Sequence, residues 1–298
     1  MRHNQPGNPR LAKMNSSHRF KMANIYFRKA FTADGIKKLI TRPSSLVDFV
    51  KMELFDVNLR PISLKDQLRT EKNTIQALSR VPQFLGRQVS VKSISAETGA
   101  EDRDEDLVDL EGLFNKYGSD KSGKHNYHLI YSRILREKRN LPLAILEIGL
   151  GTNNLDIPSN MGLRGKPGAS LRAFRDWAPN AKVYGADVDT RVLFSEERIE
   201  TFFVDQTDVA ALQALANRFP PRSFDLIIDD GLHNSEANVN TLLFALQLLK
   251  DDGVIVIEDV AIDDLPVWQI AIALLESSYE CDFVQTKGAC VVVVRRRN

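Results

Sequence analysis

Two acidic pairs in this sequence each follow a short apolar run, and a histidine lies close behind the first pair. The runs are 224–228 and 253–257. Carboxylates supply the oxygen ligands that hard divalent cations such as Mg²⁺ take, and an imidazole can accept a proton near neutral pH. If these side chains meet, they could hold a cation and deprotonate a hydroxyl beside it. The residues concerned are Asp229, Asp230, His233, Glu258 and Asp259.

The two apolar runs and the segment between them predict how these side chains are positioned. Short, continuous β-branched runs are typical of strands buried on both faces of a parallel sheet. Residues 234–250 have the length and apolar spacing of one crossover helix. Strand, helix and strand form a right-handed unit with both carboxyl ends at one edge of the sheet, where ligands bind. We therefore expect Asp230, His233, Glu258 and Asp259 to lie in one cleft.

Each acidic pair also has a purely structural interpretation. Asp229 and Asp230 could cap the following helix, with His233 as a solvated residue at its start. Glu258 and Asp259 could be ordinary charges at a strand end. The coincidence of both pairs on neighbouring strand ends favours a site. Because Asp229 alternates to the other side of its strand from Asp230, it is either structural or a neighbour of a cofactor.

A second possible binding region precedes these runs. The run 143–148 leads into Gly149 and Gly151, and glycines there let a backbone approach a nucleotide-type ligand. The third glycine of a pyrophosphate cradle is missing, and a long loop, 152–168, comes before the next helix. Asp187 follows the next strand, at the position where an acidic side chain binds a ribose diol in doubly wound folds. It could equally cap a helix.

Seven strands are predicted in all, with helices between them. Five apolar runs should form parallel strands, and a hairpin should follow a helix over 265–278. The predicted fold class is α/β: a doubly wound, mostly parallel seven-stranded sheet with a C-terminal antiparallel hairpin. This arrangement resembles that of class I methyltransferases, and acidic strand ends suit S-adenosylmethionine, which carries no phosphate. The predicted strands are 143–148, 182–186, 199–204, 224–228, 253–257, 280–286 and 289–295.

Six short motifs between about Leu113 and Arg296 occur together and in order. Through them the chain resembles the metal-dependent sugar O-methyltransferases of macrolide and related glycoside biosynthesis, the mycinamicin and demethylmacrocin type. The motifs are G-S-D-K-x-G-x-H-x-Y-x-x-x-Y (118–131), L-E-I-G-x-G (146–151), G-A-S-L-R (168–172), D-Q-T-D (205–208), I-I-D-D-G-x-H (227–233) and I-E-D (257–259).

The resemblance implies a function and roles for individual residues. It implies Mg²⁺-dependent transfer of the S-adenosylmethionine methyl group to a hydroxyl of a sugar or glycosylated small molecule, with His233 as general base. His125 and Tyr127 are candidates for the substrate side, or else they cap a helix. The implied metal ligands are Asp230, Glu258 and Asp259, and the implied cofactor-binding residues are Glu147, Gly149, Gly151, Ser170, Asp187, Asp205, Gln206 and Asp229.

The acceptor is left open by the sequence. Leu232 replaces the small polar residue that is usual in the D-D-G-x-H turn of the family, and Asn153, Asn154 and Ile157 give the preceding loop its own composition. Two other functions remain: methylation of another vicinal diol, such as a catechol, or a non-catalytic methyltransferase-like binding protein that works through its basic N-terminus.

Charge is distributed unevenly along the chain. Residues 1–100 carry 18 Lys and Arg against 7 Asp and Glu, whereas the remainder carries 22 against 32. Because base-reading motifs are missing from the basic part, we expect no nucleic-acid partner. We predict a basic, mainly helical segment over 1–105, with helix-like patches at 25–31 and 46–55. It would serve as an oligomerisation or lid element, or as an independent binding module, and 106–298 would form the methyltransferase domain.

Cysteine content and hydropathy bear on the compartment. Cys281 and Cys290 are too few for a disulfide scaffold and fit a reduced setting. The sequence shows no apolar run of transmembrane length and no signal-peptide core. We expect a cytoplasmic protein with a small-molecule substrate, no membrane partner and a homo-oligomeric assembly.

Overall fold

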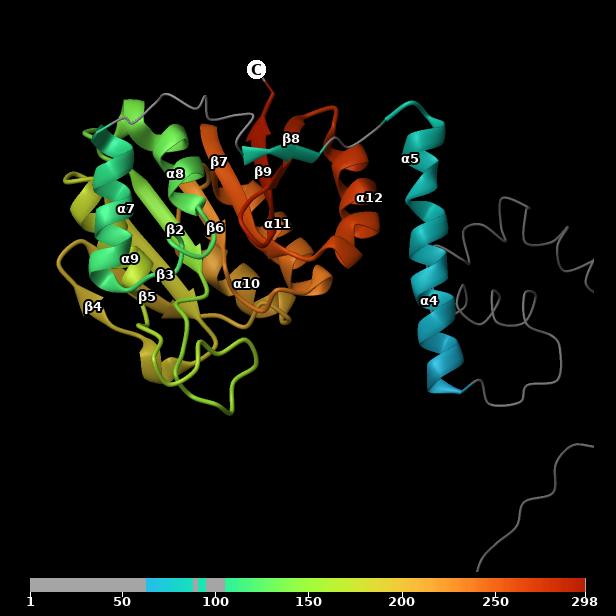
Figure 1. Cartoon of the computed structure of the whole chain (residues 1–298), viewed down its shortest axis with the longest axis horizontal. Helices are drawn as coiled ribbons and strands as arrows, with labels where there is room; N and C mark the ends of the chain where they lie inside the picture. The colour runs from blue at the N-terminus through green and yellow to red at the C-terminus, as the bar shows by residue number, and fades with distance from the viewer. Residues whose placement is uncertain (1–62, 88–90, 95–104, 298) are drawn as a thin grey trace, which may run out of the picture. The chain divides into compact units, whose positions relative to one another are not determined.

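The structure, a computed structural model, describes residues 63–87, 91–94 and 105–297. Within these residues one mixed sheet of nine strands runs in the order β1-β8-β9-β7-β6-β2-β3-β5-β4. Figure 1 shows the central strands side by side, with the C-terminal strand β9 inserted between β7 and β8. The strand order changes direction at β2, which lies between β6 and β3. In open α/β sheets a ligand binds at such a switch point.

Seven of these strands form the sheet that the sequence predicts. Five of them pair in parallel, and β9 pairs in antiparallel fashion with both β7 and β8. The predicted doubly wound, mostly parallel sheet with a C-terminal hairpin is confirmed. The strands are β2 (Ala144–Ile148), β3 (Lys182–Asp187), β5 (Ile199–Phe203), β6 (Phe224–Asp229), β7 (Leu249–Val260), β8 (Tyr279–Gln285) and β9 (Cys290–Arg296).

Two short edge strands are not predicted from the sequence. β1 (Val91–Ser93) pairs in parallel with β8, and β4 (Ser195–Glu196) pairs in antiparallel fashion with β5. Strands of two or three residues are too short to show a periodic pattern. The described residues therefore form nine strands where seven were predicted.

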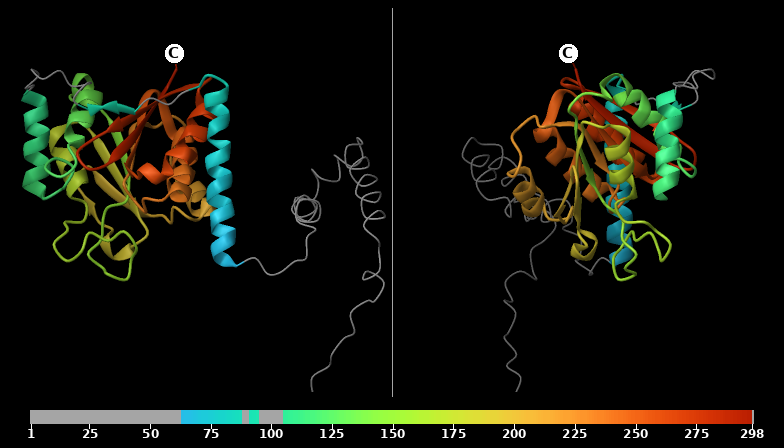
Figure 2. Two further views of the ribbon diagram at one scale, coloured as in Figure 1. Left: turned by 45° about the vertical axis from the view of Figure 1, so that its right-hand side comes forward. Right: turned by 90° about the vertical axis from the view of Figure 1, so that its left-hand side faces the viewer.

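Helices cover both faces of the sheet. The two views in Figure 2 show α7, α8 and α9 on one face and α10, α11 and α12 on the other, in agreement with the residues of the two cores. The helices are α7 (Glu105–Tyr117), α8 (Tyr127–Leu135), α9 (Ala169–Trp177), α10 (Val209–Ala216), α11 (Ser235–Leu248) and α12 (Leu265–Leu275), with single 3₁₀ turns η1 (Arg136–Lys138), η2 (Thr190–Val192) and η3 (Ile262–Asp264).

Alternation along the strands divides the interior into two cores. Ile145 and Ile228 pack on the side of α7, α8 and α9, whereas their neighbours Leu146 and Ile227 pack on the side of α10 and α11. All four side chains are fully buried. Burial of each such side chain contributes about 1.5–3 kcal/mol, so the central strands are held rigidly.

Polar caps fix where two helices begin. The Asp208 side chain accepts a hydrogen bond from Ala210 N, and Asn234 accepts one from Ala237 N, each at 2.8 Å. These caps satisfy backbone donors that a helix start leaves without partners. The start of α11 is therefore fixed directly after the turn that carries Asp230 and His233.

The predicted division of the chain at 105/106 stays a prediction. The chain separates into two units between Thr70 and Glu71, and β1 belongs to the sheet, whereas the predicted boundary lies at 105/106. The described part of the N-terminal region contains α4 (Leu64–Leu78) and α5 (Arg80–Phe84). The helical patches predicted at 25–31 and 46–55 lie outside the described residues.

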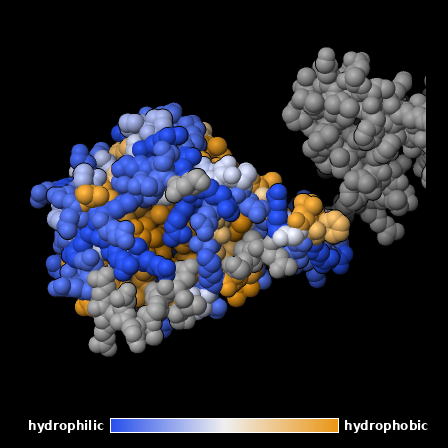
Figure 3. Space-filling view, turned by 90° about the horizontal axis from the view of Figure 1, so that it is seen from above, coloured by the Kyte–Doolittle hydropathy of each residue, from blue (hydrophilic) through white to orange (hydrophobic). Residues whose placement is uncertain are grey.

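Polar side chains cover most of the face seen in Figure 3, and apolar side chains gather in smaller areas between them. Among the described residues, each helix is too short or too polar to cross a bilayer.

Candidate active site

The candidate site lies at the carboxyl ends of the central strands β2, β6 and β7. Gly149 follows β2, and Asp230 follows β6, with a hydrogen bond from Asp230 N to Ile148 O of 2.8 Å. Gly149 has a φ of +95°, and a Cβ there would lie 2.1 Å from the backbone oxygen of Asp230. Only glycine permits this approach, so Gly149 sets the distance between the two strand ends.

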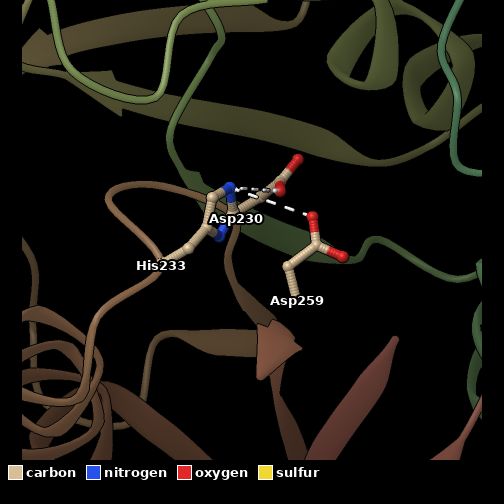
Figure 4. Close-up of side chains that lie close together, drawn as sticks. All are labelled: Asp230, His233 and Asp259. Atoms are coloured by element: carbon tan, nitrogen blue, oxygen red, sulfur yellow. Dashed lines mark ion pairs between the residues drawn. The ribbon is translucent and has the colours of Figure 1, made fainter. Parts of the chain in front are cut away.

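Asp230, His233 and Asp259 form one group. The Nε2 atom of His233 lies 3.8 Å from Asp230 Oδ1 and 3.9 Å from Asp259 Oδ2. Figure 4 shows the imidazole pointing toward both carboxylates. One ligand atom from each residue falls within 4.8 Å of the other two, a spacing that a single metal ion could bridge. The predicted meeting of Asp230, His233 and Asp259 is thus present in the structure, and Glu258 lines the same cleft as these three residues.

Two members of this group have unusual backbone conformations. His233 has a φ of +55° and Asp259 a φ of +51°. Left-handed conformations of residues other than glycine cost free energy and are found preferentially at functional sites. The β7–β9 pairing is also irregular between Ile257 and Val260, which redirects the chain at Asp259. The fold therefore holds the His233 and Asp259 side chains in place at a local cost.

Glu258 occupies the interior next to this group, and its partner is a lysine. Lys121 Nζ lies 2.5 Å from Glu258 Oε2 and 2.7 Å from Asp230 Oδ2. The Tyr131 hydroxyl donates a hydrogen bond to Glu258 Oε1. Glu258 is 1% exposed, so both of its oxygens are held by protein groups. The structure connects Asp230 and Glu258 through Lys121 rather than placing Glu258 in the three-residue group.

Lys121 and Tyr131 were not predicted as site residues. Lys121 is 2% exposed, and it lies 109 residues from Asp230 and 137 from Glu258. The G-S-D-K motif was the signal that could have found Lys121. A lone lysine in a polar loop is otherwise typical of a solvated surface, so the sequence alone gave no reason to bury it.

Burial and nearby charges shift several pKa values in this cluster. Burial lowers the pKa of Lys121, but Asp230, Glu258 and Glu147 outweigh it and raise that pKa well above its usual value. Burial raises the pKa of Glu258 despite the attraction of Lys121. Burial also acts to raise the pKa of Asp259, but the hydrogen bond from Tyr127 and the proximity of the His233 ring lower it overall. Asp259 is therefore a carboxylate at neutral pH, and Lys121 is an ammonium.

The two candidate substrate residues lie over this cluster. The Tyr127 hydroxyl donates a hydrogen bond to Asp259 Oδ1, and the His125 ring stacks on Tyr127 with centroids 4.9 Å apart. Both His125 ring nitrogens are buried and have no hydrogen-bond partner, although Nδ1 lies 3.7 Å from Asp259 Oδ1. His125, Tyr127, His233 and Asp259 line one cleft. His128, by contrast, is buried, and burial lowers its pKa.

A second cleft adjoins the first at Gly149 and Asp230. It runs along the ends of β2, β3 and β5, and its walls include the apolar side chains Ile157 and Leu232. The candidate cofactor residues that line this second cleft are Gly149, Gly151, Asp187, Asp205 and Gln206.

Asp187 fixes the shape of the second cleft. Its Oδ2 accepts a hydrogen bond from Leu150 N at 2.7 Å, and its Oδ1 accepts one from Asp189 N at 2.8 Å. Burial raises the pKa of Asp187, and these backbone donors oppose the shift. Each carboxylate oxygen has a further lone pair, so Asp187 can still accept a hydrogen bond from a ligand.

Three other candidate cofactor residues are not in this cleft. Glu147 and Asp229 are fully buried beneath the strand ends, and Ser170 donates a 2.5 Å hydrogen bond to Glu147. Asp229 accepts hydrogen bonds from Gln206 Nε2 at 2.6 Å and Asn238 Nδ2 at 3.0 Å. Asp229 thus holds the Gln206 side chain in position through a hydrogen bond. Ser170 lines the cleft of His125 and His233.

Comparison with known proteins places this arrangement among methyltransferases. Residues 166–260 match a family model described as a methyltransferase domain. The MycE methyltransferase from the mycinamycin biosynthetic pathway, solved in complex with Mg, SAH and mycinamycin VI, superposes with a TM-score of 0.51. Its sequence identity is 26%, and the match covers 63% of this chain and 54% of that chain.

Curated relatives point in the same direction. The 8-demethyl-8-alpha-L-rhamnosyl tetracenomycin-C 2'-O-methyltransferase of Streptomyces olivaceus is 32% identical over 55% of this chain and 41% of its own length. The demethylmacrocin O-methyltransferase of Streptomyces fradiae is 36% identical, and the mycinamicin VI 2''-O-methyltransferase of Micromonospora griseorubida is 35% identical. Each of these two matches covers 51% of this chain and 36% of the relative.

The chain thus spans less than half the length of the curated relatives it matches. The fold, the family model and the relatives all indicate a methyltransferase. The chain contains a methyltransferase domain with the class I fold, and its curated relatives are macrolide and polyketide sugar O-methyltransferases.

Proposed function

We propose that the protein is a Mg²⁺-dependent O-methyltransferase that moves the methyl group of S-adenosylmethionine to a sugar hydroxyl of a glycosylated small molecule. The observation that carries this proposal is the group of Asp230, His233 and Asp259 at the junction of two clefts. One cleft would hold the methyl donor and the other the acceptor.

The second cleft fits S-adenosylmethionine in its chemistry. Asp187 at the end of β3 is suited to accept hydrogen bonds from ribose hydroxyls. Ile157 and Leu232 offer apolar walls for a flat ring. The cleft lacks the glycine pattern of a pyrophosphate cradle, which agrees with a cofactor that has no phosphate. Gly149, Gly151, Asp205 and Gln206 complete the proposed binding surface.

The carboxylates at the junction fit a hard divalent cation. Asp230, Asp259 and Glu258 offer oxygen ligands of the kind that Mg²⁺ prefers, and His233 lies within the same group. A bound Mg²⁺ would supply the positive charge that makes a neighbouring hydroxyl easier to deprotonate. Asp230 and Asp259 lie on the open side of the group, at 25% and 28% side-chain exposure, whereas Glu258 lies beneath them.

His233 is the proposed general base. Its Nε2 faces the junction, between Asp230 and Asp259, whose negative charges would stabilise the imidazolium formed when it accepts a proton. The acceptor oxygen would then attack the methyl carbon in line, forming the C–O bond as the C–S bond to the sulfonium breaks. Because charge is neutralised in this step, the alignment of the two clefts and the exclusion of water would contribute most to the rate of methyl transfer.

His125 and Tyr127 are the proposed contacts to the acceptor. Both ring nitrogens of His125 are without hydrogen-bond partners among the described residues, and the residue lines the cleft of His233. A sugar presents hydroxyls that can donate to or accept from an imidazole. This arrangement supports a polyhydroxylated acceptor.

Methyl transfer from labelled S-adenosylmethionine to a panel of acceptors tests the proposal. The panel contains macrolide glycosides, rhamnosylated polyketides, their aglycones and simple catechols. We expect labelled product with a glycoside, dependence on Mg²⁺ and loss of product with EDTA. Turnover of catechols alone, or product that is independent of the sugar, would contradict the assignment of the acceptor. Binding of S-adenosylhomocysteine without turnover of any acceptor would favour a non-catalytic role.

A further inference from the structure

Lys121 is a buried cation inside the carboxylate cluster. Its Nζ atom lies 2.5 Å from Glu258 Oε2, 2.7 Å from Asp230 Oδ2 and 3.1 Å from Glu147 Oε1. The Lys121 side chain is 2% exposed, and those of Glu147 and Glu258 are 0% and 1% exposed. Buried carboxylates without a compensating positive charge strongly destabilise a fold, so this ammonium offsets part of the negative charge of the cluster.

Two of the three carboxylates around Lys121 are proposed metal ligands. Asp230 and Glu258 use one oxygen each on the ammonium. The remaining Glu258 oxygen accepts a hydrogen bond from Tyr131. A cation bound by Glu258 would therefore need an oxygen that Lys121 or Tyr131 now holds, whereas Oδ1 of Asp230 is not held by Lys121. The two positive charges would also repel each other at such short range.

The third carboxylate, Glu147, provides a position toward which the Lys121 ammonium can move. Glu147 Oε2 accepts the Ser170 hydroxyl, whereas Glu147 Oε1 has the Lys121 ammonium as its near neighbour and no hydrogen bond. Lys121 also lines the cleft of His233, so its side chain borders space into which it can move. It could release Asp230 and Glu258 while keeping Glu147.

We propose that the Lys121 ammonium takes the place of the metal ion when the ion is absent. It then forms ion pairs with Asp230 and Glu258, and it moves toward Glu147 when the ion binds. This inference rests on the metal site of the proposed function. Lys121 is then a positioning residue that keeps the empty carboxylate cluster folded and lowers its affinity for divalent cations.

Replacement of Lys121 by methionine separates this role from a purely structural one. We expect Lys121→Met in the full chain to bind Mn²⁺ or Mg²⁺ at least about tenfold more tightly than the wild type in calorimetric titrations, because a competing positive charge is removed. We also expect its melting temperature to fall without metal and to rise on metal addition by more than that of the wild type. Lys124→Met is the matched control, because Lys124 lies in the same loop with a 69% exposed side chain and should behave as the wild type.

Equal or weaker metal binding by Lys121→Met would overturn the inference. If this variant is insoluble without metal, Lys121→Met with Glu147→Gln removes one buried negative charge and tests the same gain in affinity. A crystal structure of the wild type with Mn²⁺ gives a second readout, and bound ion with all three Lys121 contacts intact would also overturn it. A wild type that binds no divalent cation would instead contradict the metal dependence of the proposed function.

Discussion

At the scale of single residues, the proposed chemistry of the site depends on His233 and its two carboxylate neighbours. His233 has a left-handed backbone conformation, and its ring is directed at Asp230 and Asp259. A residue that only capped α11 would not need this conformation, because Asn234 already provides the cap. The geometry therefore favours a chemical role for His233 over a structural one.

Substitution of His233 by glutamine should remove the base and leave binding intact. We expect kcat to fall by about 10²–10⁴-fold, the usual contribution of general base catalysis. Affinity for S-adenosylhomocysteine should stay unchanged, because His233 does not line the cofactor cleft. Steady-state kinetics and calorimetry check both expectations, with Glu236→Gln in the first turn of α11 as the control. Retention of more than a tenth of wild-type kcat would argue against His233 as the base.

The proximity of the candidate side chains could be predicted from the sequence where they lie at the ends of neighbouring strands. Asp230, His233 and Asp259 end adjacent strands or follow them within a few positions, so parallel-strand geometry was enough to bring them together. The burial of Glu258 under Lys121 depends on the path of the loop before α8. That path is a property of tertiary packing, and no local pattern encodes it.

At the scale of elements, glycine and aspartate side chains fix how the strand ends meet. Gly149 permits the close approach of the β2 loop to Asp230, and Asp189 connects the end of β3 to the loop that follows Gly151. The shape of the second cleft, the proposed cofactor site, therefore depends on Gly149 and Asp189, which act through contacts with other parts of the protein.

Gly149→Ala should damage both the fold and the site. The left-handed φ and the 2.1 Å approach of the new Cβ to Asp230 O cannot both be accommodated without movement of the chain. We expect a loss of more than about 2 kcal/mol in the free energy of unfolding. Gly112→Ala in α7 is the control: its Cβ meets open space, and the change should stabilise the protein by up to about 1 kcal/mol. Similar stabilities for both variants in urea unfolding would contradict this account of Gly149.

Asp189→Asn should destabilise the protein in a pH-dependent way. Asp189 accepts hydrogen bonds from Arg191, from Thr152 Oγ1 at 2.6 Å and from Asn154 Nδ2 at 2.7 Å, and these donors lower its pKa, with Arg191 contributing most. A carboxyl whose pKa is lowered by folding stabilises the folded state above its unfolded pKa of about 3.9, and this contribution is lost as the pH falls through the folded value.

The expected difference between wild type and Asp189→Asn is about 1–2 kcal/mol at pH 7 and shrinks steadily below about pH 4. Urea unfolding from pH 3 to pH 7 measures it. A difference that stays constant over that range would show that the ionised form of Asp189 is not what stabilises the loop.

At the scale of the whole molecule, the described sheet extends beyond the predicted methyltransferase domain. β1 pairs with β8 at the edge of the sheet, and Lys92 forms a 2.7 Å ion pair with Asp282 of β8. An edge strand that loses its neighbour exposes unpaired backbone groups. β1, which precedes the predicted boundary, therefore contributes to the stability of the sheet.

Truncation at two positions tests this contribution. A chain that begins at Glu71 keeps β1, and we expect it to bind S-adenosylhomocysteine as the full chain does. A chain that begins at Asp106 loses β1, and we expect a lower melting temperature and a greater tendency to associate, because β8 becomes the edge. Differential scanning fluorimetry and size-exclusion chromatography compare the two. Equal melting temperatures would support the predicted boundary at 105/106 over the one that the structure suggests.

The architecture was predictable because its signals are strong and local. Five buried apolar runs, the spacing of the crossover helices and the terminal hairpin each left a clear pattern, and together they predict a mostly parallel sheet with an antiparallel end. The two edge strands, β1 and β4, are too short to leave such a pattern. Among the described residues, β1 joins the sheet only through its pairing with β8, which lies some 190 residues away in the sequence.

Calorimetric titration of the wild-type chain with S-adenosylhomocysteine, with and without Mg²⁺, tests the central claim most directly. The account predicts binding at one site per chain, in the cleft beside Gly149 and Asp187, and a separate binding event for Mg²⁺ that Asp230→Asn with Asp259→Asn abolishes. An absence of S-adenosylhomocysteine binding under both conditions, from protein that is folded by circular dichroism, would contradict it.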